Sequence, residues 1–320
     1  SSAQMSGRRV GFCQSDKRWR QVSLVAFAEL CISVSHWSQG PFEDIVHKLS
    51  DVIVEAEYDS QSQQLLDNFQ GYVSGHPHTV LLDPLPAMSQ LLDRFASKQI
   101  MNWQISSPPY LEISTSDLSV IQEDVESKGL SFPLICKTRV AHGSRSHEVR
   151  DCLMDGLSDG HPPCVLQSIV NPGAVLHKVF VLGEYHFTVE RPSLKNFPPG
   201  PQCTKTIFFN SHEVSKPESS PTSLQLKVPR LPPPSGEAML APVRDLRAKL
   251  GMAMFGVDVI VSINTHTLTI INISIFPGYE GVPQFFSSLL SHIESVLDPR
   301  ELEVPQAICP LAPSVPQAEL

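Results

Sequence analysis

A run of basic, histidine and hydroxyl side chains follows an apolar segment in the middle of the chain. The apolar residues 132–136 lead directly into Lys137, and residues 138–147 contain two arginines, two histidines, one glycine and three hydroxyl side chains. A lysine at a strand end can reach a phosphate as a point charge, and a Gly- and Ser-containing loop can offer N–H groups to phosphate oxygens. A solvated basic loop after a core strand has the same composition, so both interpretations stay open.

A second set of polar side chains interrupts two apolar segments, 256–263 and 267–275, which together predict a β-hairpin. If the turn centres on Thr265, alternation places Asp258 directly opposite Asn272, with Cβ atoms about 5 Å apart, and Ser274 on the same face. These oxygen atoms suit a magnesium ion or an ordered water. A hydrogen-bonded cross-strand pair explains the pattern equally well.

Several motifs of well-known enzyme sites are absent from the sequence. It contains no G-x-x-x-x-G-K-[ST], no G-x-G-x-x-G, no G-x-S-x-G and no H-E-x-x-H. We therefore do not expect a P-loop or Rossmann nucleotide site, a serine hydrolase or a zincin. Further cations, among them Arg18, Lys178 and Arg191, are scattered along the chain, and each one alone fits a solvated side chain.

Length and composition limit the class of protein. At about 150 residues per domain, 320 residues predict two or three domains, and 41% hydrophobic residues suffice for a sizeable core. A net charge of −9 disfavours generic nucleic-acid binding. The seven cysteines form no C-x-x-C pair, which favours a reduced, cytoplasmic location. We expect no secretory signal and no membrane span.

The order of the predicted elements indicates an α/β protein. Strands separated by helices in the first third predict a parallel sheet, and the stretch between Leu30 and Asp44 is too short for a further strand. The expected strands are 9–13, 44–49, 79–82, 109–114, 132–140, 164–170, 176–182, 185–190, 256–263 and 267–275. The expected helices are 19–34, 60–74, 84–98, 116–128, 145–156, 242–250 and 283–297. Prolines cluster in 192–201, 217–242 and 305–316, which indicates loops and a tail.

Ordered blocks of the sequence resemble the inositol-tetrakisphosphate 1-kinase family, also called inositol 1,3,4-trisphosphate 5/6-kinase. The resemblance runs from about Gly7 to Leu297. The blocks are Phe-Pro-Leu-Ile-Cys-Lys-Thr-Arg-Val-Ala-His-Gly (132–143), Arg-Pro-Ser-Leu-Lys-Asn-Phe (191–197), Ile-Phe-Phe-Asn-Ser-His (207–212), Val-Ser-Lys-Pro-Glu-Ser-Ser (214–220) and Phe-Pro-Gly-Tyr-Glu-Gly-Val (276–282).

The resemblance implies an ATP-grasp fold with an N-terminal α/β pre-ATP-grasp domain. We expect an N-terminal domain at 1–93, a central domain at 94–170, a C-terminal domain with the metal hairpin at 171–298 and a disordered tail at 299–320. The implied activity is ATP-dependent phosphorylation of a ring hydroxyl of inositol tris- and tetrakisphosphates, by a monomer that binds two Mg²⁺ ions.

The resemblance also implies which residues form the sites. The ATP-binding residues would be Arg94, Lys137, Gln167, Lys178, Arg191, Ser193, Ser211 and Ser215, and the segment 167–178 would hold adenine and ribose. The residues that bind inositol polyphosphate would be Arg18, His147, Lys178, Ser274 and Gly278. The Mg²⁺ ligands would be Asp258, Asn272 and Ser274.

Two of the three metal positions depart from the family pattern. The family has an aspartate where this chain has Asn272, and an asparagine where it has Ser274. Losing one anionic ligand costs about 2–4 kcal/mol of transition-state stabilisation, or roughly 10²–10³ in rate. Two hypotheses follow: a kinase with weakened activity, or a pseudokinase that binds nucleotide or inositol polyphosphate in a regulatory role. In addition, Arg18 replaces a lysine, and the first domain is shortened between Leu30 and Pro41 and after Gln99.

Overall fold

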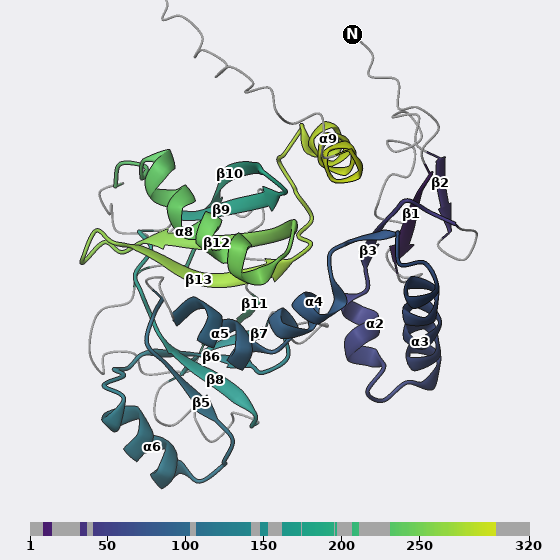
Figure 1. The fold of residues 1–320 in the computed structure, drawn as a ribbon. Helices are drawn as coiled ribbons and strands as arrows, with labels where there is room; N and C mark the ends of the chain where they lie inside the picture. Colours follow the sequence, from purple (N-terminus) through teal and green to yellow (C-terminus); the bar gives the residue numbers. More distant parts are fainter. Residues whose placement is uncertain are drawn as a thin grey trace, which may run out of the picture.

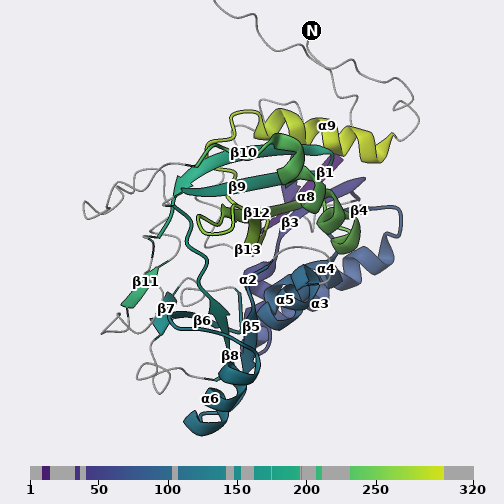
Figure 2. The same ribbon diagram turned by 90° about the vertical axis from the view of Figure 1, so that its left-hand side faces the viewer.

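The computed structural model describes residues 9–14, 33–36, 41–102, 107–141, 148–152, 162–173, 175–194, 196, 207–210 and 231–298. These residues form three β-sheets with helices packed on them (Figures 1 and 2). Within them, no helix is both long enough and apolar enough to cross a lipid bilayer. The predicted tail, 299–320, lies outside the described residues.

The first sheet is parallel, as the alternating pattern predicted, with the strand order β2-β1-β3-β4. Its strands are β1 Arg9–Gln14, β2 Ser33–His36, β3 Asp44–Lys48 and β4 Val80–Leu82. The expectation of no strand between Leu30 and Asp44 was wrong, and so was the end of the expected helix 19–34, because residues 33–36 pair in parallel with β1. Pairing with a distant strand decided this segment, and its own periodicity did not show it. Residues 19–32 of that helix lie outside the described residues.

Four helices follow the strands of this sheet: α2 Ser50–Glu55, α3 Ser60–Gly75, α4 Leu85–Leu92 and α5 Arg94–Asn102. We predicted one helix over 84–98, and the structure has two. The break is at Asp93, whose backbone is extended and bridges to Val140. Its carboxylate accepts the N–H of Phe95 at 2.8 Å and pairs with Arg139 at 2.7 Å. Asp93 therefore caps α5 and ties that helix to the second sheet.

The second sheet is antiparallel, with the strand order β11-β7-β6-β8-β5. Its elements are β5 Tyr110–Ile113, α6 Leu118–Ser127, β6 Leu134–Thr138, β7 Glu148–Cys152, β8 Cys164–Ser168 and β11 Ile207–Asn210. The expected helix 145–156 was wrong, because residues 148–152 pair with both β6 and β11. The segment 207–210 thus joins this sheet from beyond residue 170. The domain boundaries at 93, 170 and 298 stay predictions.

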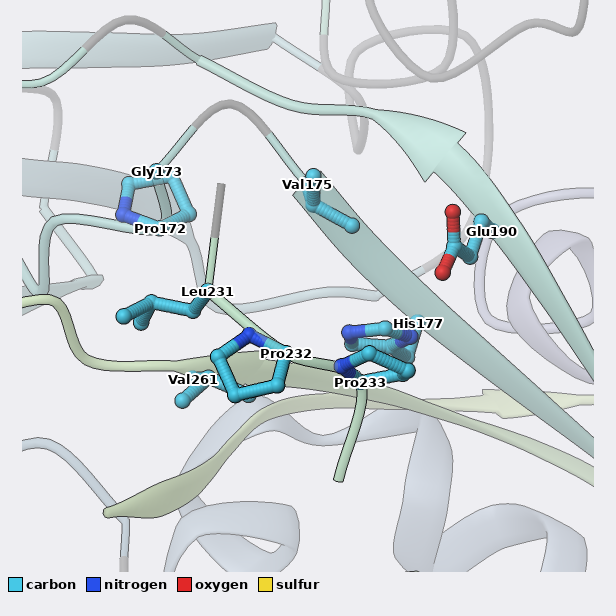
Figure 3. Close-up of a pocket in the computed structure, with 9 residues that line it drawn as sticks. All are labelled: Pro172, Gly173, Val175, His177, Glu190, Leu231, Pro232, Pro233 and Val261. Atoms are coloured by element: carbon cyan, nitrogen blue, oxygen red, sulfur yellow. The ribbon is translucent and has the colours of Figure 1, made fainter. Parts of the chain in front are cut away.

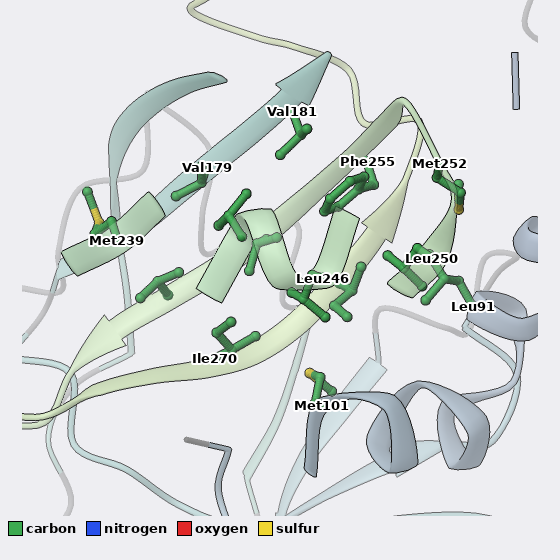
Figure 4. Packing of buried hydrophobic residues seen from close by; sticks show 14 of the residues in the cluster. Leu91, Met101, Val179, Val181, Met239, Leu246, Leu250, Met252, Phe255 and Ile270 are labelled. Carbon is green, nitrogen blue, oxygen red and sulfur yellow. The ribbon is translucent and has the colours of Figure 1, made fainter. Parts of the chain in front are cut away.

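The third sheet is also antiparallel, with the order β10-β9-β12-β13. Its elements are β9 Val175–Leu182, β10 Tyr185–Pro192, α8 Gly236–Leu250, β12 Met254–Val261, β13 Leu268–Ile275 and α9 Phe285–Leu297. Helix α8 begins six residues before the predicted start at 242, because the Ser235 side chain accepts the N–H of Ala238 and caps it. Leu246 and Leu250 of α8 pack on Phe255 and Ile270 (Figure 4), so this helix covers one face of the sheet.

The opposite face of the third sheet packs against the first sheet and α9. Phe180 and Met254 of the third sheet belong to one apolar cluster with Val10 and Val46 of the first sheet and Ile293 of α9. In addition, the Asp83 carboxylate accepts the backbone N–H groups of Ala253 and Met254. The first sheet is thus fixed to the start of β12.

Two acidic side chains are buried in or next to the first sheet. Asp44 and Asp83 are only 1% and 3% exposed. Burial raises the pKa of Asp44 to about 7, and the charge of Asp83 adds to that rise. Burial also raises the pKa of Asp83 to about 6. Because both pKa values lie above the ordinary value, the folded state binds protons more tightly than the unfolded state, and stability falls as pH rises from about 4 to about 7.

We predict that Asp44→Asn stabilises the protein at neutral pH and reduces this pH dependence. The gain in the free energy of unfolding near pH 8 should be on the order of 1–4 kcal/mol, and it should shrink towards zero as the pH falls below about 4, where the wild-type carboxyl becomes protonated in both states. Urea unfolding at both pH values measures it. Asp245→Asn, on the exposed side of α8, is the matched control. Equal stability of Asp44→Asn and wild type near pH 8 would contradict the prediction.

Candidate functional site

A row of polar side chains crosses neighbouring strands of the third sheet. This polar row consists of Lys178, Asp258, Asn272 and Ser274. The backbone register pairs Asp258 of β12 with Lys178 of β9 on one side and with Asn272 of β13 on the other. Lys178 Nζ lies 3.2 Å from Asp258 Oδ1, and Asn272 Nδ2 donates to Asp258 Oδ2 at 3.2 Å. The same Nδ2 lies 3.1 Å from Ser274 Oγ. The predicted pairing of Asp258 with Asn272 is confirmed, although the register shifts by one residue between Asp258 and Val259, nearer the turn. The two residues form the hydrogen-bonded cross-strand pair that was one of the interpretations.

The donor atoms of this row do not fit a site for two Mg²⁺ ions. Mg²⁺ sites commonly use one or two carboxylates together with substrate phosphates. Here Asp258 is the single carboxylate of the row, and its Oδ1 is already paired with Lys178. The Asn272 carbonyl oxygen accepts from Arg94 at 3.4 Å, and Ser274 offers a neutral hydroxyl. Within the described part of the chain, no three His, Cys, Asp or Glu side chains are grouped to hold a metal ion.

Lys137, at the end of β6, approaches the row from the second sheet. It is 9% exposed, and its Nζ donates to Gln167 Oε1 and to the Ile271 carbonyl, both at 3.3 Å. Burial lowers the pKa of Lys137 to about 7, Arg94 lowers it further, and the charge of Asp258 opposes the shift. The sequence singled out this lysine, and the structure shows that it bridges the second and third sheets.

Helix α5 brings two more cations to the same place. Arg94 and Lys98 are four residues apart, so they lie on one face of the helix. Arg94 reaches Asn272, and burial lowers its pKa to about 10. Lys98 is 3% exposed, and burial, with the charges of Lys137 and Arg94, lowers its pKa well below the ordinary value.

The sequence analysis did not identify Lys98. Its spacing from Arg94 was the available signal, since an i, i+4 pair of cations shares one helix face. We did not use that signal, because the predicted helix 84–98 ended at Lys98, and a side chain at a helix end is commonly exposed. The separate helix α5 begins at Arg94, whose side chain reaches Asn272 of β13, and the charges of Arg94 and Lys137 act on Lys98.

The other described residues of the predicted sites lie nearby but not in the row. Arg191 of β10 donates from Nη2 to the Glu280 carbonyl at 2.7 Å, so it braces the loop between β13 and α9. Gly278 lies in that loop, which Tyr279 fastens to the sheet by donating to the Val181 carbonyl at 2.7 Å. Ser193 is half-buried after β10. Arg18, His147, Ser211 and Ser215 lie outside the described residues.

A small pocket lies at one end of the third sheet, between β9 and the segment before α8 (Figure 3). Val175, His177, Pro232 and Val261 line it, and its volume is about 20 Å³. A water molecule needs about 10–15 Å³ measured in this way, so the space suits one water and no nucleotide. His177 and Lys178 are neighbours on one strand and point to opposite faces. The pocket is therefore behind the polar row and apart from it.

Comparisons with known proteins agree with this arrangement. The family model described as the inositol 1,3,4-trisphosphate 5/6-kinase pre-ATP-grasp domain matches residues 9–88, and the model for the ATP-grasp domain of the same kinase matches residues 100–295. An inositol-tetrakisphosphate 1-kinase from Xenopus laevis is 44% identical over 316 residues, covering 92% of this chain and 80% of the relative. One from Danio rerio is 43% identical over 316 residues, with the same coverage of both chains.

The fold is also seen in solved structures of low sequence identity. D-alanyl-alanine synthetase A from Vibrio cholerae superimposes with a TM-score of 0.58 and 11% identity, covering 91% of this chain and 98% of that one. Together with the two family models, this likeness confirms the ATP-grasp fold and its N-terminal pre-ATP-grasp domain.

Proposed function

This chain belongs to the inositol 1,3,4-trisphosphate 5/6-kinase family, and we propose that it is a slow ATP-dependent kinase of inositol tris- and tetrakisphosphates. Inositol 1,3,4-trisphosphate and inositol 3,4,5,6-tetrakisphosphate are the substrates we propose. In the reaction, a ring hydroxyl oxygen bonds to the γ-phosphorus of ATP. The bond from this phosphorus to the β–γ bridging oxygen breaks, ADP leaves, and the hydroxyl proton passes to solvent.

The observation that carries the proposal is the charge around the polar row. Arg94, Lys98, Lys137 and Lys178 come together from α5, β6 and β9. Asp258 is the single carboxylate among them in the described part of the site. Both substrates carry several phosphates, and clustered, partly desolvated cations bind such groups through charge-assisted hydrogen bonds.

The two substrates would lie on different sides of the row. We assign the ATP phosphates to Arg94 and Lys137, and adenine and ribose to the segment 167–178. The inositol polyphosphate would lie between Lys178 and the first sheet, beside Gly278. For ATP, the remaining residues that we propose as ligands are Arg191, Ser193, Ser211 and Ser215. For inositol polyphosphate, they are Ser274, Arg18 and His147.

We attribute the slow reaction to weak Mg²⁺ binding. Kinases of this fold generally use Mg²⁺, which neutralises charge on the transferred phosphoryl group. Asn272 and Ser274 can offer oxygen atoms but no negative charge. Asp258 gives one carboxylate oxygen to Lys178, which reduces its capacity for a metal ion further.

The same ion pair supports a second candidate function, a pseudokinase that binds nucleotide or inositol polyphosphate and transfers nothing. Under this hypothesis, Lys178 and Asn272 occupy the carboxylate oxygens of Asp258, and Asn272 also donates to Ser274, so that these oxygen atoms are not available to a metal ion. The two candidates share both binding sites and differ in turnover, so a turnover measurement on a restored metal site separates them.

For the nucleotide side, we predict that Lys137→Met lowers the affinity for ATP at least about tenfold, or roughly 1.4 kcal/mol. The side chain is buried, and methionine has a similar length without the charge, so the fold should stay intact although two hydrogen bonds between the sheets are lost. Calorimetric titration with ATP measures the affinity. The control is Lys128→Met, which removes an exposed charge after α6. Unchanged affinity in the folded variant would remove Lys137 from the nucleotide site.

For the substrate side, Lys178→Ala should weaken inositol polyphosphate binding more than ATP binding, since this lysine faces the first sheet. The remaining affinity should depend less on salt, because one charge-assisted contact is gone. Titrations with inositol 3,4,5,6-tetrakisphosphate and with ATP at low and high salt give both numbers. Arg244→Ala, on the exposed side of α8, serves as the matched control. An equal loss for the two ligands contradicts the assignment.

For the metal side, the double change Asn272→Asp with Ser274→Asn should raise turnover at least about tenfold, a change of ~1.4 kcal/mol. It should also lower the Mg²⁺ concentration needed for half-maximal rate, because a second carboxylate then faces the phosphates. Asn264→Asp, at the exposed tip of the same hairpin, adds the same charge away from the site and should change neither quantity.

Two other outcomes are informative. A wild type that already turns over as fast as the double variant would show that the missing carboxylate does not limit the reaction. Two proteins that both bind ATP and both fail to turn over would favour the pseudokinase.

A further inference from the structure

We propose that Lys98, together with Arg94 and Lys137, neutralises the nucleotide triphosphate in place of a metal ion, so that this chain binds ATP without a divalent cation. The proposal rests on the proposed nucleotide site and deepens it. It assigns Lys98 as a phosphate ligand and metal-free ATP as the bound form.

The burial of Lys98 carries the argument. The residue is 3% exposed, and its Nζ has no hydrogen-bond partner among the described residues. A buried ammonium group without a partner costs several kcal/mol or more. An anion bound beside Lys98 would offset this cost and oppose the lowering of the pKa of Lys98 that burial causes. Arg94 and Lys137 lie close enough for their charges to act on Lys98.

The charge balance among the described residues also favours an anion from outside. Within the described part of the chain, Lys98 and Lys137 form no ion pair with a carboxylate, and Lys137 donates only to two neutral oxygens. Asp258, the carboxylate whose charge acts on Lys137, is paired with Lys178. A cation entering this space would be repelled, whereas metal-free ATP carries more negative charge than its Mg²⁺ complex. The charges therefore favour the metal-free nucleotide.

The position of Lys98 is fixed before any ligand arrives. Asp93 caps α5 through the Phe95 N–H and holds Arg139 by an ion pair. The Arg94 N–H donates to the Arg139 carbonyl at 2.8 Å, which attaches the start of the helix to the strand end that carries Lys137. Pre-organised cations lose little freedom when a ligand binds, and this increases affinity.

The test is ATP binding by the full chain, measured by calorimetry in excess EDTA and again in Mg²⁺. Wild type should bind ATP in EDTA at least as tightly as in Mg²⁺. Lys98→Met should weaken binding in EDTA at least about tenfold and weaken it less in Mg²⁺. The same variant should unfold at a higher temperature without ligand, because it removes a buried amine that has no hydrogen-bond partner among the described residues. Lys128→Met, which removes an exposed lysine charge, should change neither quantity.

The outcomes separate this inference from the proposed function. Binding that requires Mg²⁺ overturns the inference and leaves the proposed kinase site in place, as does a stable Lys98→Met variant with unchanged affinity in EDTA. Absence of ATP binding by wild type in both conditions overturns the proposed function, and the inference with it. If Lys98→Met does not fold, the wild-type comparison of EDTA with Mg²⁺ still decides the question.

Discussion

The ion pair between Lys178 and Asp258 is the interaction on which the rest of the site depends. It joins the two central strands of the third sheet, and it uses the single carboxylate that the row provides. The neighbouring polar groups therefore make their hydrogen bonds without a second carboxylate. Asn272 donates to Asp258 and accepts from Arg94, and Lys137 donates to a backbone carbonyl and to an amide oxygen. The site is thus arranged around excess positive charge, which is the property that a polyphosphate ligand satisfies.

The part of the site that the sequence predicted well is the part that depends on local geometry. Alternation along a hairpin predicted the pairing of Asp258 with Asn272 before the structure, but it did not predict the one-residue register shift between Asp258 and Val259. The position of Lys137 at a strand end was also clear, because an apolar run stops there. The fold class came from ordered sequence blocks, which carry more information than any single spacing.

The parts that the sequence did not predict depend on contacts between distant segments. Strands β2 and β7 form because β1 and β6 offer them unpaired backbone groups, and no local pattern shows this. Lys98 was missed for the same kind of reason. Its burial follows from the helix break at Asp93, and that break needs Arg139 and Val140 as partners. A lysine is rarely fully buried, so composition argues against the arrangement that tertiary contacts produce.

The first sheet controls the site through the strand that carries Asp258. Asp83 accepts the N–H groups of Ala253 and Met254, at the start of β12, four residues before Asp258. Because a strand transmits a fixed repeat along its length, anchoring this start sets the distance between the first sheet and the row formed by Lys178 and Asp258. A substrate held between them would contact both. The first sheet is therefore held beside the third sheet by Asp83 and by the apolar cluster around Met254, both of which lie within the described residues.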